Sequence, residues 1–138
     1  MLTTSLVHPE ILYHLAAAGH GAKVLITDGN YPASTKVNET VPVVYLNLRP
    51  NLVSVVDVLE TLCSVCNFEK AEVMWPDDNH RPAIFDRFEE VLAPLKVTPI
   101  ARLDFYEECA TSQDLVLAIV SGETTPYANI LLTVGVTN

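Results

Sequence analysis

The sequence predicts a three-layer α/β/α domain built around a mixed sheet of about six strands. Short apolar runs typical of buried strands alternate along the chain with segments of helical periodicity, and 49% of the 138 residues are hydrophobic. A chain of this length and composition can bury a substantial core. It contains no repeat, low-complexity tract or internal boundary. Residues 1–138 are therefore expected to form one domain.

The first expected elements are a helix and two strands. Residues 8–18 place apolar side chains on one helical face and have a proline in the first turn, where its missing amide hydrogen costs least; Gly19 ends this helix. A buried strand follows at 24–27 and ends in the turn residues 28–30, Asp-Gly-Asn. After a loop, residues 43–46 predict a second strand.

The rest of the chain continues the alternation. Apolar residues at helical spacing predict two long helices, and continuous apolar runs predict strands that are buried on both faces. In chain order the remaining elements are the helix 51–65, the strand 72–75, the helix 82–95, the short strand 100–103, the helix 104–111, and the strands 115–120 and 130–134, which are separated by the polar loop 121–129.

The charge balance argues against a nucleic-acid partner. The chain has 17 acidic and 8 basic residues, a formal net charge of −9 and an isoelectric point near 4.7, whereas a phosphate backbone is bound by clustered Lys and Arg. A neutral or cationic ligand is expected instead. The mean hydropathy of +0.27 is high for a small monomer, so we also expect a homo-oligomer that buries part of this apolar surface.

No segment points to a membrane or to a metal. All apolar runs fall short of the roughly 20 residues that span a bilayer, and the first residues lack the basic start and long apolar stretch of a signal peptide, so a soluble, cytoplasmic protein is expected. Cys63 and Cys66 have the spacing of half a zinc site, but there is no second pair and no nearby histidine. We interpret them as two small apolar residues one helical turn apart.

Two polar, glycine-marked parts of the chain are expected to form one small-molecule pocket. Residues 19–21 (Gly-His-Gly) and 28–32 (Asp-Gly-Asn-Tyr-Pro) flank the first strand, and residues 122–129 lie between the last two strands about a hundred positions later. Polar side chains at the points where strands start or stop are typical of binding sites in α/β proteins. We therefore expect these segments to meet.

His20 is the leading catalytic candidate. It lies between glycines, which lets a ligand approach the backbone, and its imidazole can give or take a proton near neutral pH. From the spacing alone, a histidine that only contacts the carbonyls at the helix end is an equal alternative. Asp28 could orient His20, accept a hydrogen bond from a ligand hydroxyl, or cap the following turn; taken alone, the cap is the better interpretation.

Two further pairs of residues could bind a ligand. Tyr127 and Asn129 lie two positions apart, so in an extended segment both side chains would face the same way. Ordinary loop composition, which Pro126 also favours, is the alternative. Arg102 and Tyr106 would share a face of a helix and offer donors to several hydroxyls, although a solvated surface explains the same spacing and is preferred on spacing alone.

A pattern along the whole chain resembles the D-ribose pyranase and L-fucose mutarotase family. It consists of the helix start 8–10 (His-Pro-Glu), the triplet 19–21, Asp28 with Pro32, residues 105–107 (Phe-Tyr-Glu), and the C-terminal block 122–136, which includes Tyr-Ala-Asn-Ile-Leu-Leu at 127–132. Within the family, residues 102–107 resemble the fucose mutarotase branch, because the ribose pyranase branch typically has His at position 102 and Lys at position 106.

The resemblance implies an enzyme that interconverts the α and β anomers of a monosaccharide such as L-fucose without a metal or cofactor. It also implies rings of subunits, often decamers, in which each pocket lies at a subunit interface and is completed by a neighbouring chain. By the same resemblance, His20 is the acid/base residue. Asp28, which we count with it in the catalytic group, holds the sugar together with Arg102, Tyr127 and Asn129, and Tyr106 lies close to it.

One position departs from the family pattern. The family commonly has an acidic residue after the Gly-His-Gly or Gly-His-Thr triplet, whereas this chain has Ala22, and residues 34–81 match the family poorly. Two alternatives to a fucose-type mutarotase therefore remain: a non-catalytic sugar-binding or regulatory oligomer, and a pyranase acting on ribose. A nucleotide-binding protein is disfavoured because no glycine-rich phosphate loop follows a predicted strand.

Overall fold

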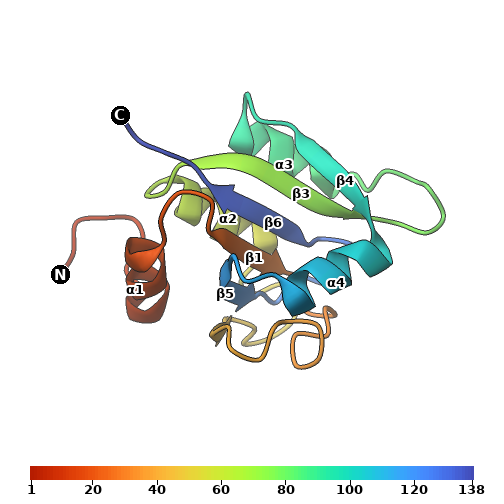
Figure 1. Cartoon of the computed structure of the whole chain (residues 1–138), viewed down its shortest axis with the longest axis horizontal. Coiled ribbons are helices and arrows are strands. Elements are labelled where there is room, and N and C mark those ends of the chain that lie inside the picture. The colour runs from red at the N-terminus through yellow and green to blue at the C-terminus, as the bar shows by residue number, and fades with distance from the viewer.

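A computed structural model describes residues 1–138 and contains four helices and six strands. In chain order they are α1 (Pro9–Ala17), β1 (Lys23–Thr27), β2 (Val43–Tyr45), α2 (Val55–Cys63), β3 (Phe68–Trp75), α3 (Ile84–Leu92), β4 (Val97–Ala101), α4 (Arg102–Thr111), β5 (Leu115–Val120) and β6 (Ile130–Val134). The strands form one sheet in the order β2-β5-β1-β6-β3-β4 (Figure 1).

The sheet is mixed because β6 runs against the other strands. It pairs antiparallel with both of its neighbours, β1 and β3, whereas β1 with β5, β2 with β5, and β3 with β4 are parallel pairs. The start of β6 therefore lies at the edge of the sheet where β1 and β3 end. The predicted mixed sheet of about six strands is confirmed.

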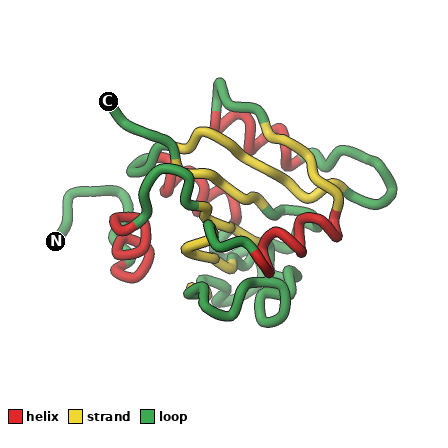
Figure 2. The backbone as a smooth tube through the Cα atoms, viewed as in Figure 1, coloured by secondary structure: helices red, strands yellow, loops and turns green.

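Helices cover both faces of the sheet. In Figure 1, α2 and α3 lie behind the sheet, α4 lies in front of it, and α1 lies at the left. Successive side chains of a strand point to opposite faces, so Val24 and Ile26 of β1 pack in a core cluster with α2 and α3, whereas Leu25 packs in a second cluster with Phe105 of α4. The long loop after β1, at the bottom of Figure 2, adds Tyr31 to this second cluster.

Two helices differ from their predicted bounds for identifiable reasons. The helix predicted from residue 51 begins at Val55, because Ser54 and Asp57 form a capping box in which each side chain accepts from the backbone N–H of the other. The helix predicted over 82–95 ends at Leu92, two residues before Pro94, since the residue that precedes a proline is disfavoured in helical geometry.

The strand predicted at 100–103 is displaced toward the N-terminus. It occupies Val97–Ala101 and includes Pro99, which lies outside the predicted bounds and has no amide hydrogen to donate to a neighbouring strand. β4 is an edge strand with β3 as its single neighbour, so one side of its backbone needs no partner. Arg102, predicted to lie in the strand, is instead the first residue of α4.

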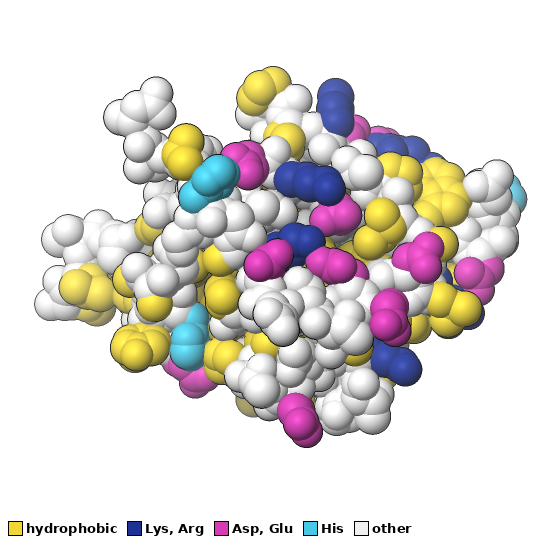
Figure 3. Space-filling view, in the orientation of Figure 1, with side chains coloured by type: hydrophobic (Ala, Val, Ile, Leu, Met, Phe, Trp, Pro, Cys, Tyr) yellow, Lys and Arg dark blue, Asp and Glu magenta, His cyan; other side chains and the backbone are white.

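Acidic and basic side chains lie next to one another on the α4 side of the sheet (Figure 3). The ammonium group of Lys23, on β1, donates a hydrogen bond of 2.5 Å to Glu108 of α4 and lies 3.9 Å from the buried carboxylate of Glu72. Lys70 lies 3.6 Å from Glu72 on the other side. The hydrogen bond from Lys23 lowers the pKa of Glu108. The bond between Lys23 and Glu108 links α4 to the sheet.

No helix in the structure is both long enough and apolar enough to pass through a bilayer.

The Glu108→Gln variant should be less stable than the wild type near pH 6 and should approach it as the pH falls. Because the pKa of Glu108 is lowered in the folded state, its contribution is present above the unfolded value near 4.5 and is lost as the pH falls through the folded value. Urea unfolding at a series of pH values measures this. Glu107→Gln, which changes an exposed neighbour, is the matched control; equal pH profiles of the three proteins would contradict the prediction.

Candidate functional site

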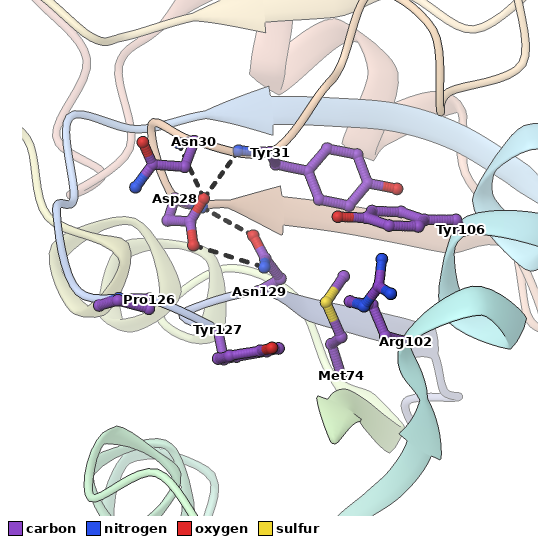
Figure 4. Close-up of a pocket in the computed structure, with 9 residues that line it drawn as sticks. All are labelled: Asp28, Asn30, Tyr31, Met74, Arg102, Tyr106, Pro126, Tyr127 and Asn129. Atoms are coloured by element: carbon purple, nitrogen blue, oxygen red, sulfur yellow. Dashed lines mark hydrogen bonds between the residues drawn. The ribbon is translucent and has the colours of Figure 1, made fainter. Parts of the chain in front are cut away.

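A pocket with a volume of about 160 Å³ opens at the edge of the sheet where β1 and β3 end and β6 begins. Binding sites of α/β proteins are expected at the carboxyl ends of strands. Figure 4 shows the nine residues that line it: Asp28, Asn30, Tyr31, Met74, Arg102, Tyr106, Pro126, Tyr127 and Asn129. Five of the six residues predicted for the site are therefore together in one chain.

Asp28 and Asn129 form a buried clamp at one end of the pocket. The backbone N–H of Asp28 donates to Asn129 Oδ1 at 2.9 Å, and Asn129 Nδ2 lies 3.5 Å from Asp28 Oδ2. Asp28 Oδ1 accepts from the backbone N–H groups of Asn30 and Tyr31 at 2.9 and 2.8 Å. The predicted turn cap by Asp28 is thus confirmed, and the clamp joins segments about a hundred positions apart.

Burial and hydrogen bonding act in opposite directions on the Asp28 carboxyl. Asp28 is 2% exposed, and this burial raises its pKa, while the hydrogen bonds from the backbone of Asn30 and Tyr31 and from Asn129 oppose the rise. Oδ1 accepts from two backbone N–H groups, and Oδ2 lies 3.5 Å from the amide nitrogen of Asn129. The geometry of the carboxylate therefore suits holding the pocket in shape better than exchanging protons with a ligand.

Tyr127 reaches the pocket through a turn and not through an extended segment. Its φ of +62° lies in the left-handed region, which a residue with a bulky side chain adopts rarely. This backbone conformation, between the exposed Pro126 and the buried Ala128, directs the tyrosine ring into the pocket (Figure 4). Tyr127 and Asn129 line the same pocket, but the extended geometry offered as the reason for pairing them is wrong.

Arg102 and Tyr106 occupy the other end of the pocket. They lie one turn apart on α4, with the guanidinium carbon 5.9 Å from the centre of the tyrosine ring, and the Tyr106 ring packs edge-on against Tyr31 at 5.4 Å. Arg102 Nε donates to Asp77 Oδ2 at 3.0 Å, and this bond raises the pKa of the arginine. The two side chains therefore share a face of α4, and this face lines the pocket.

His20 lies away from this pocket, at the opposite edge of the sheet. It precedes β1, whereas Asp28 follows β1, and the five residues of that strand alone span about 16 Å. The backbone N–H of Gly21 donates to the carbonyl of Val134, at the end of β6, which holds the turn at that edge. Within one chain His20 and Asp28 therefore do not meet, because the extended strand keeps them apart.

The His20 imidazole pairs with a carboxylate from β3. Its Nε2 lies 2.9 and 3.0 Å from the two carboxylate oxygens of Glu69, and 58% of the histidine side chain is exposed. It does not bond the carbonyls at the end of α1, which was the alternative interpretation. The imidazole therefore lies on the surface of the chain and outside the pocket.

Sequence reasoning missed three residues around these two locations. Met74 lines the pocket, Asp77 holds Arg102, and Glu69 holds His20. Tyr31, which also lines the pocket, belongs to the segment 28–32 that was expected there, but no role was assigned to it. Asp77 and Glu69 carry no local signal, because each meets its partner across the sheet from a distant part of the sequence.

The cysteines show no metal-binding arrangement. No group of three or more His, Cys, Asp or Glu side chains is placed to hold a metal ion. Cys63 is the last residue of α2, Cys66 follows that helix, and both are free thiols. Burial raises the pKa of Cys63 to about 11, which disfavours a reactive thiolate.

Comparison with known proteins identifies the family. Residues 1–137 match the model of the RbsD / FucU transport protein family. The chain belongs to this family. It is 31% identical to a D-ribose pyranase of Symbiobacterium thermophilum, over 99% of both chains, and 29% identical to a fucose mutarotase of Danio rerio, over 96% of this chain and 90% of that protein.

Solved structures of family members share the fold. RbsD of Bacillus subtilis complexed with D-ribose superposes with a TM-score of 0.84 at 24% identity, and a fucose mutarotase of Streptococcus pneumoniae in complex with L-fucose with a TM-score of 0.80 at 21% identity; each match covers 100% of both chains. The relatives are named as enzymes that act on two different sugars. Membership of the RbsD/FucU family therefore leaves the choice of sugar open.

The Asn129→Ala variant should lose about 1–3 kcal/mol of stability, because it leaves the buried N–H of Asp28 without its acceptor. It should also raise the pKa of Asp28 further, since Asn129 donates to the carboxylate. Urea unfolding measures the first effect and NMR titration of the carboxyl carbon the second. Asn30→Ala, which removes an exposed side chain from the same pocket rim, is the control. Equal losses of stability in the two variants would contradict the stabilising role of the hydrogen bonds between Asp28 and Asn129.

Proposed function

We propose that the protein is a mutarotase that interconverts the α and β anomers of a monosaccharide, with L-fucose as its preferred sugar. The observation that carries the proposal is the pocket in which Arg102, Tyr106, Tyr127 and Asn129 converge. In a member of the RbsD/FucU family, whose relatives are named as sugar pyranases and mutarotases, such a set of donors and acceptors suits the hydroxyls of a sugar.

The pocket combines hydrogen-bonding groups with apolar surface. Guanidinium, phenol and amide groups bind hydroxyls, while the thioether of Met74 and the rings of Tyr31 and Tyr106 offer apolar contacts. Its volume of about 160 Å³ is below the about 300–1,000 Å³ of pockets for drug-sized ligands. A 6-deoxy sugar such as L-fucose, which presents both hydroxyls and a methyl group, matches this lining.

Arg102 and Tyr106 favour fucose over ribose in this proposal, since they stand at positions where the pyranase branch typically has His and Lys. We assign them, with Tyr127 and Asn129, to sugar binding. Asp28 is assigned a positioning role, because its carboxylate is engaged by backbone N–H groups and by Asn129.

His20 is proposed as the acid/base residue, supplied by a second copy of the chain. Within one chain it lies at the far end of β1, where Glu69 holds its Nε2 and 58% of the side chain is exposed to a neighbouring copy. Exposed apolar side chains, among them Tyr13, Leu48 and Leu103, are consistent with a homo-oligomer, for which we propose the decameric rings implied by the family resemblance.

The proposed chemistry needs only proton transfer. The anomeric hydroxyl loses a proton, the ring oxygen gains one, the ring opens to the aldehyde, and rotation followed by closure gives the other anomer. A positioned histidine contributes about 10² to 10⁴-fold to such a step. Because no electrons are transferred, we propose that no cofactor takes part.

The wild-type protein should accelerate the exchange between α- and β-L-fucose above the rate in buffer, and His20→Ala should lose about 10²-fold or more of that acceleration. Saturation-exchange NMR measures both rates, and the same assay with D-ribose and D-galactose ranks the sugars. His14→Ala, on α1, is the control. Sugar binding without faster exchange would instead favour the non-catalytic sugar-binding oligomer.

Mixed oligomers should show whether the His20 that acts in a pocket comes from a neighbouring chain or from the same chain. His20→Ala and Arg102→Ala are each expected to be nearly inactive, but co-assembled chains should regain exchange, because an intact pocket can receive His20 from a chain that carries the Arg102 substitution. Each variant assembled alone is the control. If the mixture stays as inactive as its components, the proposed sharing of the site between chains is wrong.

A further inference from the structure

We propose that Asp77 is a positioning residue that orients the guanidinium of Arg102 toward the sugar pocket. The role of the pocket as a sugar site rests on the proposed function, but the contact between the two side chains does not. Asp77 lies in the segment 34–81, which matches the family pattern poorly, and is not part of the pocket lining. It acts on the site only through Arg102.

The contact engages one part of the guanidinium and leaves the rest available. Arg102 Nε donates to Asp77 Oδ2 at 3.0 Å, so Asp77 does not occupy the two Nη groups. The guanidinium also lies over the ring of Tyr106 at 5.9 Å and stands beside Met74 within the pocket (Figure 4). An anchor on Nε and a ring on one face restrict the planar fork to a single orientation toward a ligand.

The backbone brings Asp77 and Arg102 together at the same edge of the sheet. β3 and β4 are parallel and end in register, with Trp75 paired to Ala101. Arg102 follows Ala101 directly and Asp77 lies two residues beyond Trp75, so both leave the sheet side by side. The loop after β3 extends at the right of Figure 2 before α3 begins.

Internal bonds hold the loop that carries Asp77. The backbone N–H of Asn79 donates to the carbonyl of Pro76 at 3.1 Å, which closes a turn around Asp77. The indole N–H of Trp75 donates to Asn79 Oδ1 at 2.6 Å, and Asn79 adopts a φ of +62°. A turn fixed at both ends presents the Asp77 carboxylate at a defined place instead of leaving it on a free loop.

Electrostatics explains why Arg102 needs this partner. It is the first residue of α4, where the partial positive charge of the helix N-terminus disfavours a cation. A carboxylate at the same place is favoured by the helix and neutralises the arginine. Without Asp77, the long side chain of Arg102 would gain rotameric freedom. Ordering it again when the ligand binds would cost free energy of binding.

The inference is tested by a double-mutant cycle on Asp77 and Arg102. Binding of L-fucose, and of D-ribose as a second probe, is measured by calorimetry for the wild type, Asp77→Asn, Arg102→Ala and the double variant, and KM and kcat are taken from exchange NMR. Asp77→Asn should raise the Kd and KM about two- to tenfold and leave kcat unchanged, because it removes pre-organisation and no reacting group. In the double variant, the Asp77→Asn change should cause no loss of affinity beyond the loss caused by Arg102→Ala alone.

Two controls separate positioning from a structural role. Asp77→Glu should recover part of the affinity, and Asp78→Asn, the neighbouring carboxylate that bonds the backbone N–H of His80, should bind like the wild type. Independently of any ligand, the Nε–H signal of Arg102 should be protected from exchange with water in the wild type and lose that protection in Asp77→Asn.

Three outcomes would overturn the inference. Asp77→Asn could bind sugar as tightly as the wild type, or its loss of affinity could add in full to the loss caused by Arg102→Ala. The third outcome is an Arg102 Nε–H in the wild type that is not protected from exchange with water. The proposed function fails differently, through a wild type that neither binds nor interconverts either sugar. In that case the Nε–H measurement still decides whether Asp77 orients Arg102.

Discussion

The hydrogen bonds between Asp28 and Asn129 are the constraint on which the pocket depends. They join the end of β1 to the start of β6, which meet only because β6 runs antiparallel to its neighbours. In an all-parallel sheet the segment before β6 would lie at the opposite edge. The reversed strand therefore brings the two polar loops together, and the buried clamp holds them at hydrogen-bonding distance.

The extended strand β1 separates His20 from the pocket. β1 is bounded by His20 on one side and Asp28 on the other, and an extended strand cannot fold back on itself. A chain that carries its acid/base candidate at one edge of the sheet and its binding groups at the other works as one site only if copies associate. In this view the homo-oligomer is a condition of the chemistry and does more than bury apolar surface.

The segment that resembles the family least, residues 34–81, also contributes to the pocket. Met74 lines the pocket from β3, and Asp77 holds Arg102 from the loop that follows. Arg102 and Lys23, two of the few cations in a strongly acidic chain, each bond a carboxylate. Pairing with Asp77 holds the Arg102 cation at the pocket, although the chain as a whole has a net charge of −9.

The sequence by itself determined the alternation of elements and the mixed α/β class, because periodicity and turn chemistry are local in the chain. The choice of Arg102, Tyr106, Tyr127 and Asn129 as candidate site residues came from the family resemblance, since their spacing alone is equally explained by solvated surface and loop. Element bounds shifted where a neighbour mattered, as at Pro99, which is tolerated because β4 lies at the sheet edge. Only the tertiary structure decided that His20 lies away from the pocket and that Glu69 holds His20 while Asp77 holds Arg102. It also decided that Tyr127 enters the pocket from a turn in which its φ is positive. The physical reason is that strand direction and cross-sheet contacts join residues far apart in the sequence, and no local pattern records them.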